Sequence, residues 1–504
     1  MHPIPGNPTI QKFTAFLLFA PTFLGSASAL ATAQGADDDR LKKLEDEFKA
    51  YRERTERENA ELRREISQLK QQSVSSPGAP ASRALEDAIA ELQVRVSGLT
   101  ARQGDFERTR GQRTAFLDMS LDILTNIGTS EATDEEIPLL QLGHHDPAQR
   151  GFTLSNMELQ IEGAVDPYFR GTGVMAMVID AEGETVLEVE EAYLTTTQLP
   201  ADLQLKAGVY FTEFGRLNRQ HAHTWEFVDQ PIVLGRYFGG DGLRGPGARA
   251  SWLAPVPFFL EFQSGIQNPR GETLTSFIGN EEVWPGVTGS SGAEVAGAGG
   301  GFPFRKGTVD SLGDMLFTER VSTSLDLTDE SSFVLGGSAL FGPNSTGEDG
   351  RTQIYGVDFY YRWRPTDNYQ GFPFVSFQTE AMWRNYRADS FFGDIDDDGT
   401  NEAFPSRRFR DFGYYAQMLW GITRPWVAGA RAEYVDGNGL ATGGDGSLDR
   451  RIRYALNLTY YPTEFSRIRL QGNWDRIQEL NDNSYFSVWL QFEILFGAHA
   501  PHRF

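Results

Sequence analysis

The feature that most constrains this chain is a strictly alternating stretch near its C-terminal end, residues 484–496. Every even-numbered residue from Phe486 to Phe496 is apolar, whereas the odd-numbered residues form a polar face that ends at Leu495. Side chains of a β-strand point alternately to its two faces, so one whole face of this strand is apolar over roughly 20 Å.

The same two-residue period recurs in about sixteen segments between residues 114 and 504, with no core helix between them. The mean hydropathy is −0.39, and we find no apolar run long enough for a membrane-spanning helix. Strands with one apolar and one polar face suit a closed barrel with lipid outside and a polar lumen inside. We therefore predict an all-β transmembrane antiparallel barrel of about sixteen strands.

The connections between these segments support an even number of strands. Short connections, such as residues 199–202 and 422–425, alternate with connections that include the long ones, such as residues 214–246 and 269–314. Bacterial barrels have short periplasmic turns and long outer loops. Both termini are then periplasmic, and every long loop lies outside. We expect one of the two longest loops to fold inward and narrow the lumen.

The region before the barrel has a different composition. Residues 1–33 read as a secretory signal, with Lys12 before an apolar run and an Ala31-Thr32-Ala33 cleavage site. Residues 37–110 have the 3–4 spacing of an α-helical coiled coil, interrupted by a flexible linker at 73–82. The sequence thus predicts export and an N-terminal periplasmic coiled-coil stalk, which either pairs with other chains or folds back on itself.

Composition narrows the classes of function. The chain has no Cys, which excludes disulfides and thiolate metal sites, and its net charge of −23 argues against a nucleic-acid partner. No Ser/His/Asp arrangement stands out, so we do not expect an enzyme.

The polar faces of the later strands supply candidate pore-lining residues. Opposed basic and acidic side chains across a lumen orient polar solutes, whereas the same pairs can simply brace the wall. Both readings stay open for Arg362, Arg364, Arg384, Arg431, Arg451, Arg453, Arg467, Arg469 and Asp475.

Two groups of residues have the chemistry of metal ligands. His144-His145 and His221-x-His223 are close pairs on predicted outer loops, and imidazole is a common zinc ligand. The alternative is that they are solvated loop residues. Asp394, Asp396 and Asp398 precede Gly399 in the spacing that begins a calcium loop, although Pro405 stands where the last ligand is expected. No cofactor is required, and zinc and calcium are the candidate ions.

Several motifs together resemble a known family. FTEFGRLNRQHAHTWEFVDQP (residues 211–231), VDPYFRG (165–171), TQIYGVDFYYRW (352–363) and GAHAPHRF (497–504) are similar to porin-like outer-membrane barrels often labelled "zinc-regulated TonB-dependent outer membrane receptor". The resemblance implies an outer-membrane location, zinc-linked expression, and metal contact at His221 and His223. The stretch before the first predicted strand is too short for the plug domain of such receptors, which argues against TonB dependence.

The stalk and barrel together more distantly resemble phosphate-selective porins, which implies a homotrimer. The preferred hypothesis is an outer-membrane porin-like channel for passive diffusion of small polar solutes or ions. The alternatives are a zinc-linked receptor or uptake protein, and a structural anchor whose barrel is filled.

Overall fold

The computed structural model of the chain describes residues 117–179, 185–271, 273–279, 309–368, 371–393, 401–437, 450–478 and 484–497. All of these residues belong to the second of the two units into which the chain divides, Thr114–Phe504. The predicted signal, the predicted stalk and the predicted calcium loop at Asp394, Asp396 and Asp398 lie outside the described residues.

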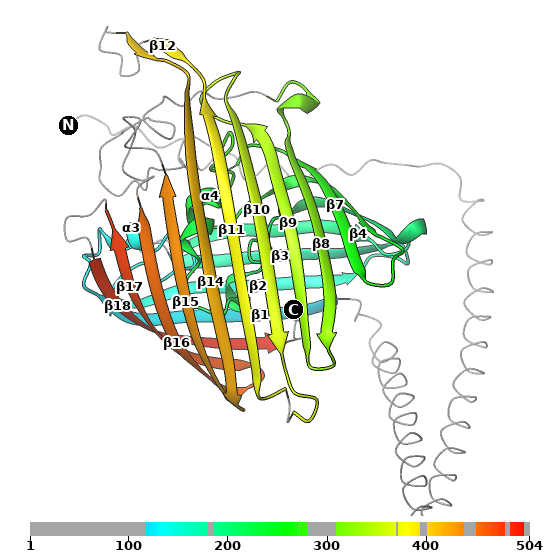
Figure 1. The fold of residues 1–504 in the computed structure, drawn as a ribbon, viewed down its shortest axis with the longest axis vertical. Helices are drawn as coiled ribbons and strands as arrows, with labels where there is room; N and C mark the ends of the chain where they lie inside the picture. Colours follow the sequence, from blue (N-terminus) through cyan, green and yellow to red (C-terminus); the bar gives the residue numbers. More distant parts are fainter. Residues whose placement is uncertain are drawn as a thin grey trace, which may run out of the picture. The chain divides into compact units, whose positions relative to one another are not determined.

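Sixteen antiparallel strands form one closed barrel (Figure 1), which confirms the predicted fold class of the barrel region. Each strand pairs with its neighbour along the chain, and β1 closes the barrel against β18. The barrel strands are β1 (Leu117–Ser130), β2 (Gly151–Ala164), β3 (Phe169–Ile179), β4 (Thr185–Thr196), β5 (Leu203–Phe211), β6 (Arg244–Leu253), β7 (Phe259–Gln267), β8 (Leu316–Thr328), β9 (Ser331–Pro343), β10 (Arg351–Trp363), β11 (Phe374–Ala388), β14 (Arg407–Thr423), β15 (Trp426–Gly437), β16 (Arg451–Thr463), β17 (Ser466–Ile477) and β18 (Ser484–Gly497).

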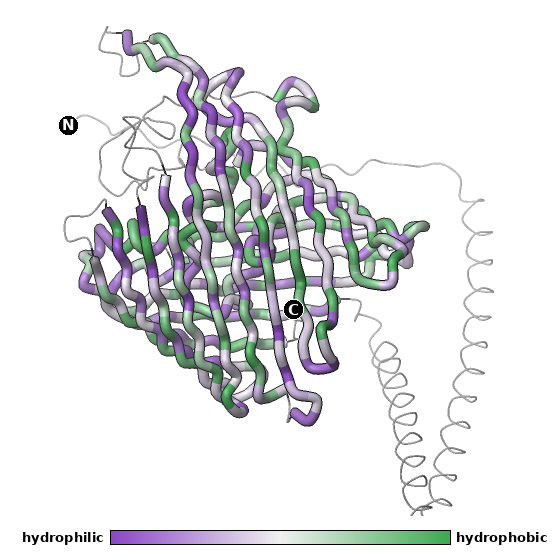
Figure 2. Tube along the Cα trace, viewed as in Figure 1, coloured by the Kyte–Doolittle hydropathy of each residue, from purple (hydrophilic) through white to green (hydrophobic). Residues whose placement is uncertain are grey.

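The two faces of the wall differ as the alternation predicts. On β18, Phe486, Phe492 and Phe496 are 48%, 38% and 52% exposed on the outer surface, whereas Trp489 and Gln491 are buried inside the barrel. Apolar and polar positions alternate along most strands (Figure 2). The outside of the barrel is therefore apolar, and the polar side chains of the wall face the lumen.

Short and long connections between the strands alternate as predicted. Turns of a few residues join β2 to β3, β8 to β9, β14 to β15 and β16 to β17, and the long connections lie at the other end of the strands. A separate two-stranded sheet, β12 (Phe391–Gly393) with β13 (Glu402–Phe404), extends one long connection.

Helices in the described residues are short and lie in the connections. None of those described is long and apolar enough to cross a membrane. They are α3 (Ile137–Leu140), η2 (Pro200–Asp202), η3 (Ala222–Thr224), α4 (Ile232–Phe238) and η4 (Leu312–Asp314).

Candidate functional site

The connection between β5 and β6 folds into the barrel, and we name its residues 212–243 the lumen segment. Phe214, Tyr237 and Phe238 are fully buried there, and they pack in one apolar cluster with wall residues such as Met382 and Tyr415. This agrees with the expectation that one long loop folds inward and narrows the lumen. The described part of the β7–β8 connection joins the same cluster through its own apolar residues, Leu274 and Phe277.

The local sequence explains why this stretch leaves the wall. The two-residue alternation stops after Phe211, and the apolar residues that follow have no strand period. Helix α4 starts directly after Pro231 and ends before Gly239, whose φ of 82° favours glycine. Gly215 has a φ of 59°, and a Cβ there would collide with the carboxylate of Glu380. The segment therefore bends sharply and approaches the wall closely.

One carboxylate of the lumen segment, Asp229, binds the wall most extensively. It is 0% exposed and forms ion pairs with Arg431 and with Arg453, the latter at 3.0 Å. The side-chain amides of Gln471 and Asn473 donate to its two oxygens at 2.9 and 2.6 Å. Burial by itself would raise the pKa of Asp229, but the two arginines outweigh it and lower that pKa below its usual value. Asp229 thus remains charged and holds the segment to β15, β16 and β17.

The two arginines that hold Asp229 are themselves paired with wall carboxylates. Arg431 Nε lies 2.6 Å from Glu433 and Arg453 Nε lies 2.6 Å from Asp475. Glu433 in turn accepts the backbone N–H of Ile232 at 2.6 Å, at the start of α4. These charges form one continuous network between the wall and the segment.

Two further arginines bind backbone oxygens of the lumen segment. Arg467 donates to the carbonyl of His223 at 2.8 Å, and Arg469 donates to the carbonyl of Trp225 at 3.0 Å. Arg467 also pairs with Glu493 of β18. These guanidinium groups brace the segment.

Most of the sequence-predicted lumen residues face the interior. Arg384 pairs with Asp411 at 2.5 Å, and Arg451 donates to the carbonyl of Leu139 at 2.7 Å in the β1–β2 connection. Arg362 is half-buried near the short-turn end of β10. Arg364 lies beyond the end of β10 and is exposed. The buried members of the predicted set are Arg384, Arg431, Arg451, Arg453, Arg467, Arg469 and Asp475.

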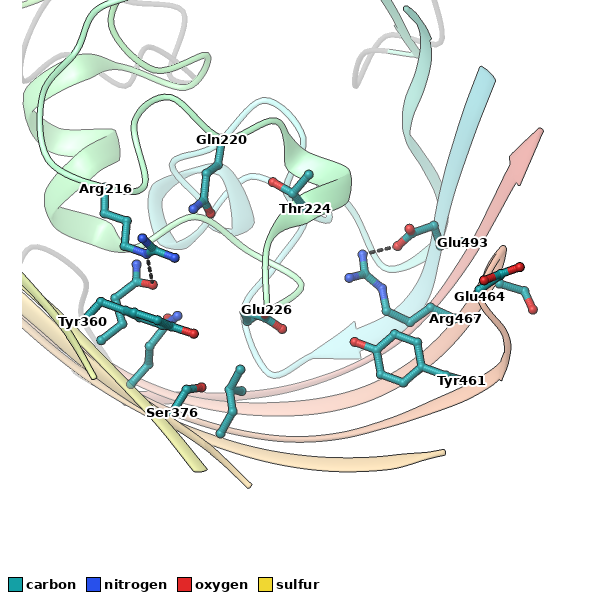
Figure 3. Close-up of a pocket in the computed structure, with 14 residues that line it drawn as sticks. Arg216, Gln220, Thr224, Glu226, Tyr360, Ser376, Tyr461, Glu464, Arg467 and Glu493 are labelled. Atoms are coloured by element: carbon teal, nitrogen blue, oxygen red, sulfur yellow. Dashed lines mark hydrogen bonds and ion pairs between the residues drawn. The ribbon is translucent and has the colours of Figure 1, made fainter. Parts of the chain in front are cut away.

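A polar cavity of about 260 Å³ remains beside the lumen segment (Figure 3). Glu464 and Ser466 place it near the end of the barrel that carries the short turns. On one side the guanidinium of Arg216 lies 4.0 Å from the centre of the Tyr360 ring; the pair of Arg467 with Glu493 lies on the other. Both signs of charge therefore line this cavity. Its other lining residues include Gln220, Thr224, Glu226, Ser376 and Tyr461.

The lumen segment also contributes to a cluster of histidines and glutamates. His221 Nδ1 lies 2.9 Å from Glu190 Oε2 and 3.5 Å from Glu158 Oε2, and His221 Nε2 lies 3.1 Å from Glu191 Oε2. His223 Nδ1 lies 3.2 Å from the same Glu158 oxygen. The structure therefore brings the predicted His221/His223 pair against wall carboxylates of β2 and β4.

A third imidazole comes from the other predicted pair. His145 Nε2 lies 3.2 Å from Glu190 Oε1, and its Nδ1 lies 3.0 Å from the carbonyl oxygen of Ser155. Burial alone would lower the pKa of His145, but Glu190 outweighs it and raises that pKa to about 9. Glu158, Glu190 and Glu191 likewise raise the pKa of His221 well above its usual value, against the effect of burial. The cluster strongly favours positive charge.

His144 lies in a separate group. Its Nδ1 is 2.8 Å from Asp241, and these two residues lie with Glu188 close enough for one ion. The side chain of His144 is 59% exposed, and Arg244 already pairs with Glu188 at 2.7 Å. This group is more exposed to solvent than the His221 cluster, and the guanidinium of Arg244 already supplies a positive charge to it.

Two β-bulges bring the cluster residues together. The register between β3 and β4 shifts between Val174 and Met175, so that the neighbouring residues Glu190 and Glu191 are both buried. A second shift between β1 and β2 leaves Ser155 unpaired, and its carbonyl faces His145. Bulges re-aim side chains and are common beside functional sites.

Sequence reasoning missed the glutamates of this cluster. Glu158 and Glu190 come from strands far from His221 in the chain, whereas Asp229, which is close to His221 in the chain, binds arginines instead. The only local signal is Glu188-x-Glu190-Glu191, an acidic run in a strand with an otherwise apolar face.

The fold and interior define a closed sixteen-stranded barrel whose lumen holds an inserted segment. Solved structures similar to it include the outer membrane channel DcaP of Acinetobacter baumannii, with a TM-score of 0.45 and 11% identity, covering 75% of this chain and 96% of that one. The anion-selective porin from Comamonas acidovorans has a TM-score of 0.44 and 8% identity, covering 75% and 99%. The trimer form of OmpT of Vibrio cholerae has a TM-score of 0.42 and 10% identity, with the same coverage.

No family model matches the chain. An uncharacterized protein of Aquifex aeolicus (strain VF5) is 31% identical over 425 residues, which cover 80% of this chain and 83% of the relative. The chain belongs to the same family as that protein.

Proposed function

We propose that the chain forms an outer-membrane channel for passive diffusion of small polar solutes or ions. The observation that carries this proposal is the reversed polarity of the barrel. Large apolar side chains such as Leu456, at 68%, and Phe496, at 52%, are exposed outside, whereas arginines and carboxylates are buried inside. A water-soluble protein gains nothing from this arrangement, but a barrel in lipid requires it.

The lumen segment sets the width of the proposed route. It crosses the interior and binds β2, β4, β11, β15, β16 and β17, so any solute has to pass beside it. The cavity next to it has a guanidinium on one side and a mixed ion pair on the other, which suits solutes with polar or charged groups. We infer that Arg216, Arg467 and Glu493 contact the solute there.

Single-channel conductance in planar bilayers tests this proposal. The purified full-length chain is expected to give small, lasting, stepwise conductance. A variant whose residues 216–241 are replaced by a short Gly/Ser linker should conduct more, because the lumen is wider. Lasting absence of conductance in the full-length chain, with the folded barrel verified by circular dichroism, would contradict the channel.

A filled structural anchor is the second candidate, and the network around Asp229 favours it, because a fully paired interior needs no solute. Conductance decides between the two: an anchor gives none in the full-length chain and some only when the segment is removed. A zinc-linked receptor or uptake protein is the third, favoured by the histidine cluster. Reversible block of the conductance by micromolar Zn²⁺ would support it.

An oligomeric state and a location in the cell accompany the proposed channel function. We infer an outer-membrane homotrimer, with membrane lipid around the rest of the barrel and the N-terminal stalk in the periplasm. The broad apolar exterior supplies surface for both lipid and neighbouring subunits. Light scattering of the detergent-solubilised chain should give three times the chain mass, and a monomer mass would exclude the trimer. We propose no enzymatic activity and no required cofactor.

A further inference from the structure

We propose that a divalent transition-metal ion of the zinc type binds between the lumen segment and the wall, with His221, Glu158 and Glu190 as its ligands. His145 and His223 contact the same two glutamates, each with one ring nitrogen 3.2 Å from a carboxylate oxygen. The site is distinct from the polar cavity, and metal binding does not depend on conduction. It would fix the segment to β2 and β4, on a different arc of the wall from the Asp229 network.

The distances between candidate ligand atoms fit one small ion. Zinc binds imidazole nitrogen and carboxylate oxygen at about 2.0–2.2 Å, so two ligand atoms at a tetrahedral zinc lie about 3.3 Å apart. His221 Nδ1 lies 2.9 and 3.5 Å from the nearest oxygens of Glu190 and Glu158. The three ligand atoms lie within 4.8 Å of one another.

The further imidazoles surround the same two carboxylates. His223 Nδ1 is 3.2 Å from the Glu158 oxygen that faces His221, and His145 Nε2 is 3.2 Å from the other oxygen of Glu190. The rings of His221 and His223 are stacked, with centres 5.9 Å apart. Mixed imidazole and carboxylate ligands are those that zinc and similar ions prefer.

A separate observation is a buried carboxylate on β1 that lacks hydrogen bonds within the described part of the chain. The carboxylate of Asp122 on β1 is 2% exposed, and neither oxygen has a hydrogen-bond partner among the described residues. Its charge interacts with His223. Burying a carboxylate that accepts no hydrogen bond is costly, and a divalent ion next to His223 would help to offset that cost.

Further contacts orient the imidazole rings. The carbonyl of Ser155 receives His145 Nδ1 at 3.0 Å, which leaves Nε2 directed at Glu190. Glu191 lies 3.1 Å from His221 Nε2, so that Nδ1 is the nitrogen directed at the proposed ion. Such contacts fix the orientation of imidazole ligands in metal sites. Both bulges in this part of the wall serve these contacts, since Ser155 and Glu190 are the bulged residues.

The test uses the refolded full-length chain with Zn²⁺ as the probe. After treatment with a chelator, titration calorimetry is expected to show one strong site per chain, and Zn²⁺ should raise the thermal unfolding temperature. In the Glu158→Gln/Glu190→Gln variant the affinity should fall about tenfold or more. The matched control is Glu188→Gln, a substitution on β4 in the separate His144 group, and it should leave the strong site unchanged.

Two results would overturn the proposal: no strong site in the unaltered chain, or a strong site that the Glu158→Gln/Glu190→Gln variant keeps. If the double variant does not fold, the single variant His221→Gln serves instead, because it keeps the size and polarity of the side chain. Visible absorption of bound Co²⁺ provides a second measurement, which should show nitrogen and oxygen ligation. Failure of these tests leaves the channel untouched, because conductance is measured separately.

Discussion

The wall of the barrel and the lumen segment are stabilised by opposite means. The wall is a continuous ladder of backbone hydrogen bonds with apolar side chains outside, and each strand needs only its two neighbours. The lumen segment has little regular structure and depends on side chains from strands far away in the sequence, such as Glu433 and Asn473. The wall is therefore a local structure repeated sixteen times, whereas the segment is held by a few long-range charges.

This difference has an energetic consequence. Loss of one side chain from the outer face removes a small part of a large apolar surface. Loss of one charge from the interior leaves its partners buried without compensation, which costs more than the pair itself contributes. The interior is therefore expected to be more sensitive to single substitutions than the exterior.

The largest effect is expected from Asp229→Ala. The substitution leaves Arg431 and Arg453 buried with one carboxylate each and removes the acceptor of two amides. We expect a loss of about 3–5 kcal/mol in the free energy of unfolding, as for other broken buried ion pairs. Urea titration in lipid vesicles measures this loss, and the released segment should also increase the conductance.

The control for this substitution is Asp134→Asn at the rim of the barrel. Asp134 pairs with Arg150 at 2.9 Å, but both side chains are about half exposed. An exposed pair contributes little, so the control should unfold like the unaltered chain. Equal stability of Asp229→Ala and the control would show that the segment is not held by its charges.

The sequence predicted the wall far better than the interior. Two-residue alternation is a local property, so it located the closing strand and placed Arg453 and Arg469 on the inner face. It could not show that Asp229 would meet these arginines, because that pairing depends on how a loop folds across the barrel. Arg364 also kept the alternation but lies beyond the end of its strand, since nothing in a local period marks where a turn begins.

The histidine cluster illustrates the same limit. The paired spacing identified His221 and His223, but their partners depend on bulges. A bulge shifts the alternation by one residue, so Glu190 and Glu191 both reach the interior where a regular strand would place only one of them there. Only the three-dimensional register reveals such residues.

A substitution on the outer face of the wall is expected to destabilise the barrel less than Asp229→Ala does. Leu456 lies near the middle of β16 and is 68% exposed on the outer face. Leu456→Arg should reduce the free energy of unfolding in lipid vesicles by about 2–4 kcal/mol, because a charge at the centre of the bilayer is poorly solvated. The matched variant Leu327→Arg, near the short-turn end of β8, should cost about 0–1 kcal/mol. Equal costs at the two positions would mean that lipid does not surround the barrel.

The smallest loss of stability is expected when the pH is lowered, because protonation removes the charge of Asp229 but keeps its side chain. Its pKa in the folded chain lies below the ordinary value of 3.8. The stability that it contributes is thus fully present above about pH 4 and is lost as the pH falls through the folded value. Asp146, whose pKa is raised to about 7 chiefly by burial, acts in the opposite direction, since its protonation between about pH 7 and 4 stabilises the fold.

Single-channel conductance recorded while the pH is lowered distinguishes the effect of protonating Asp229 from that of protonating Asp146. The step size should stay constant from about pH 7 to about pH 4 and increase only below that, as the lumen segment loosens. In Asp229→Asn the acid-induced increase should disappear. In the metal-free chain, which is used for this measurement, His145 and His221 do not contribute, because their pKa values are raised above this range. A transition centred between about pH 6.5 and 7 would instead indicate Asp146 or a histidine with an ordinary pKa, and the Asp229 network would then not be what holds the segment in place.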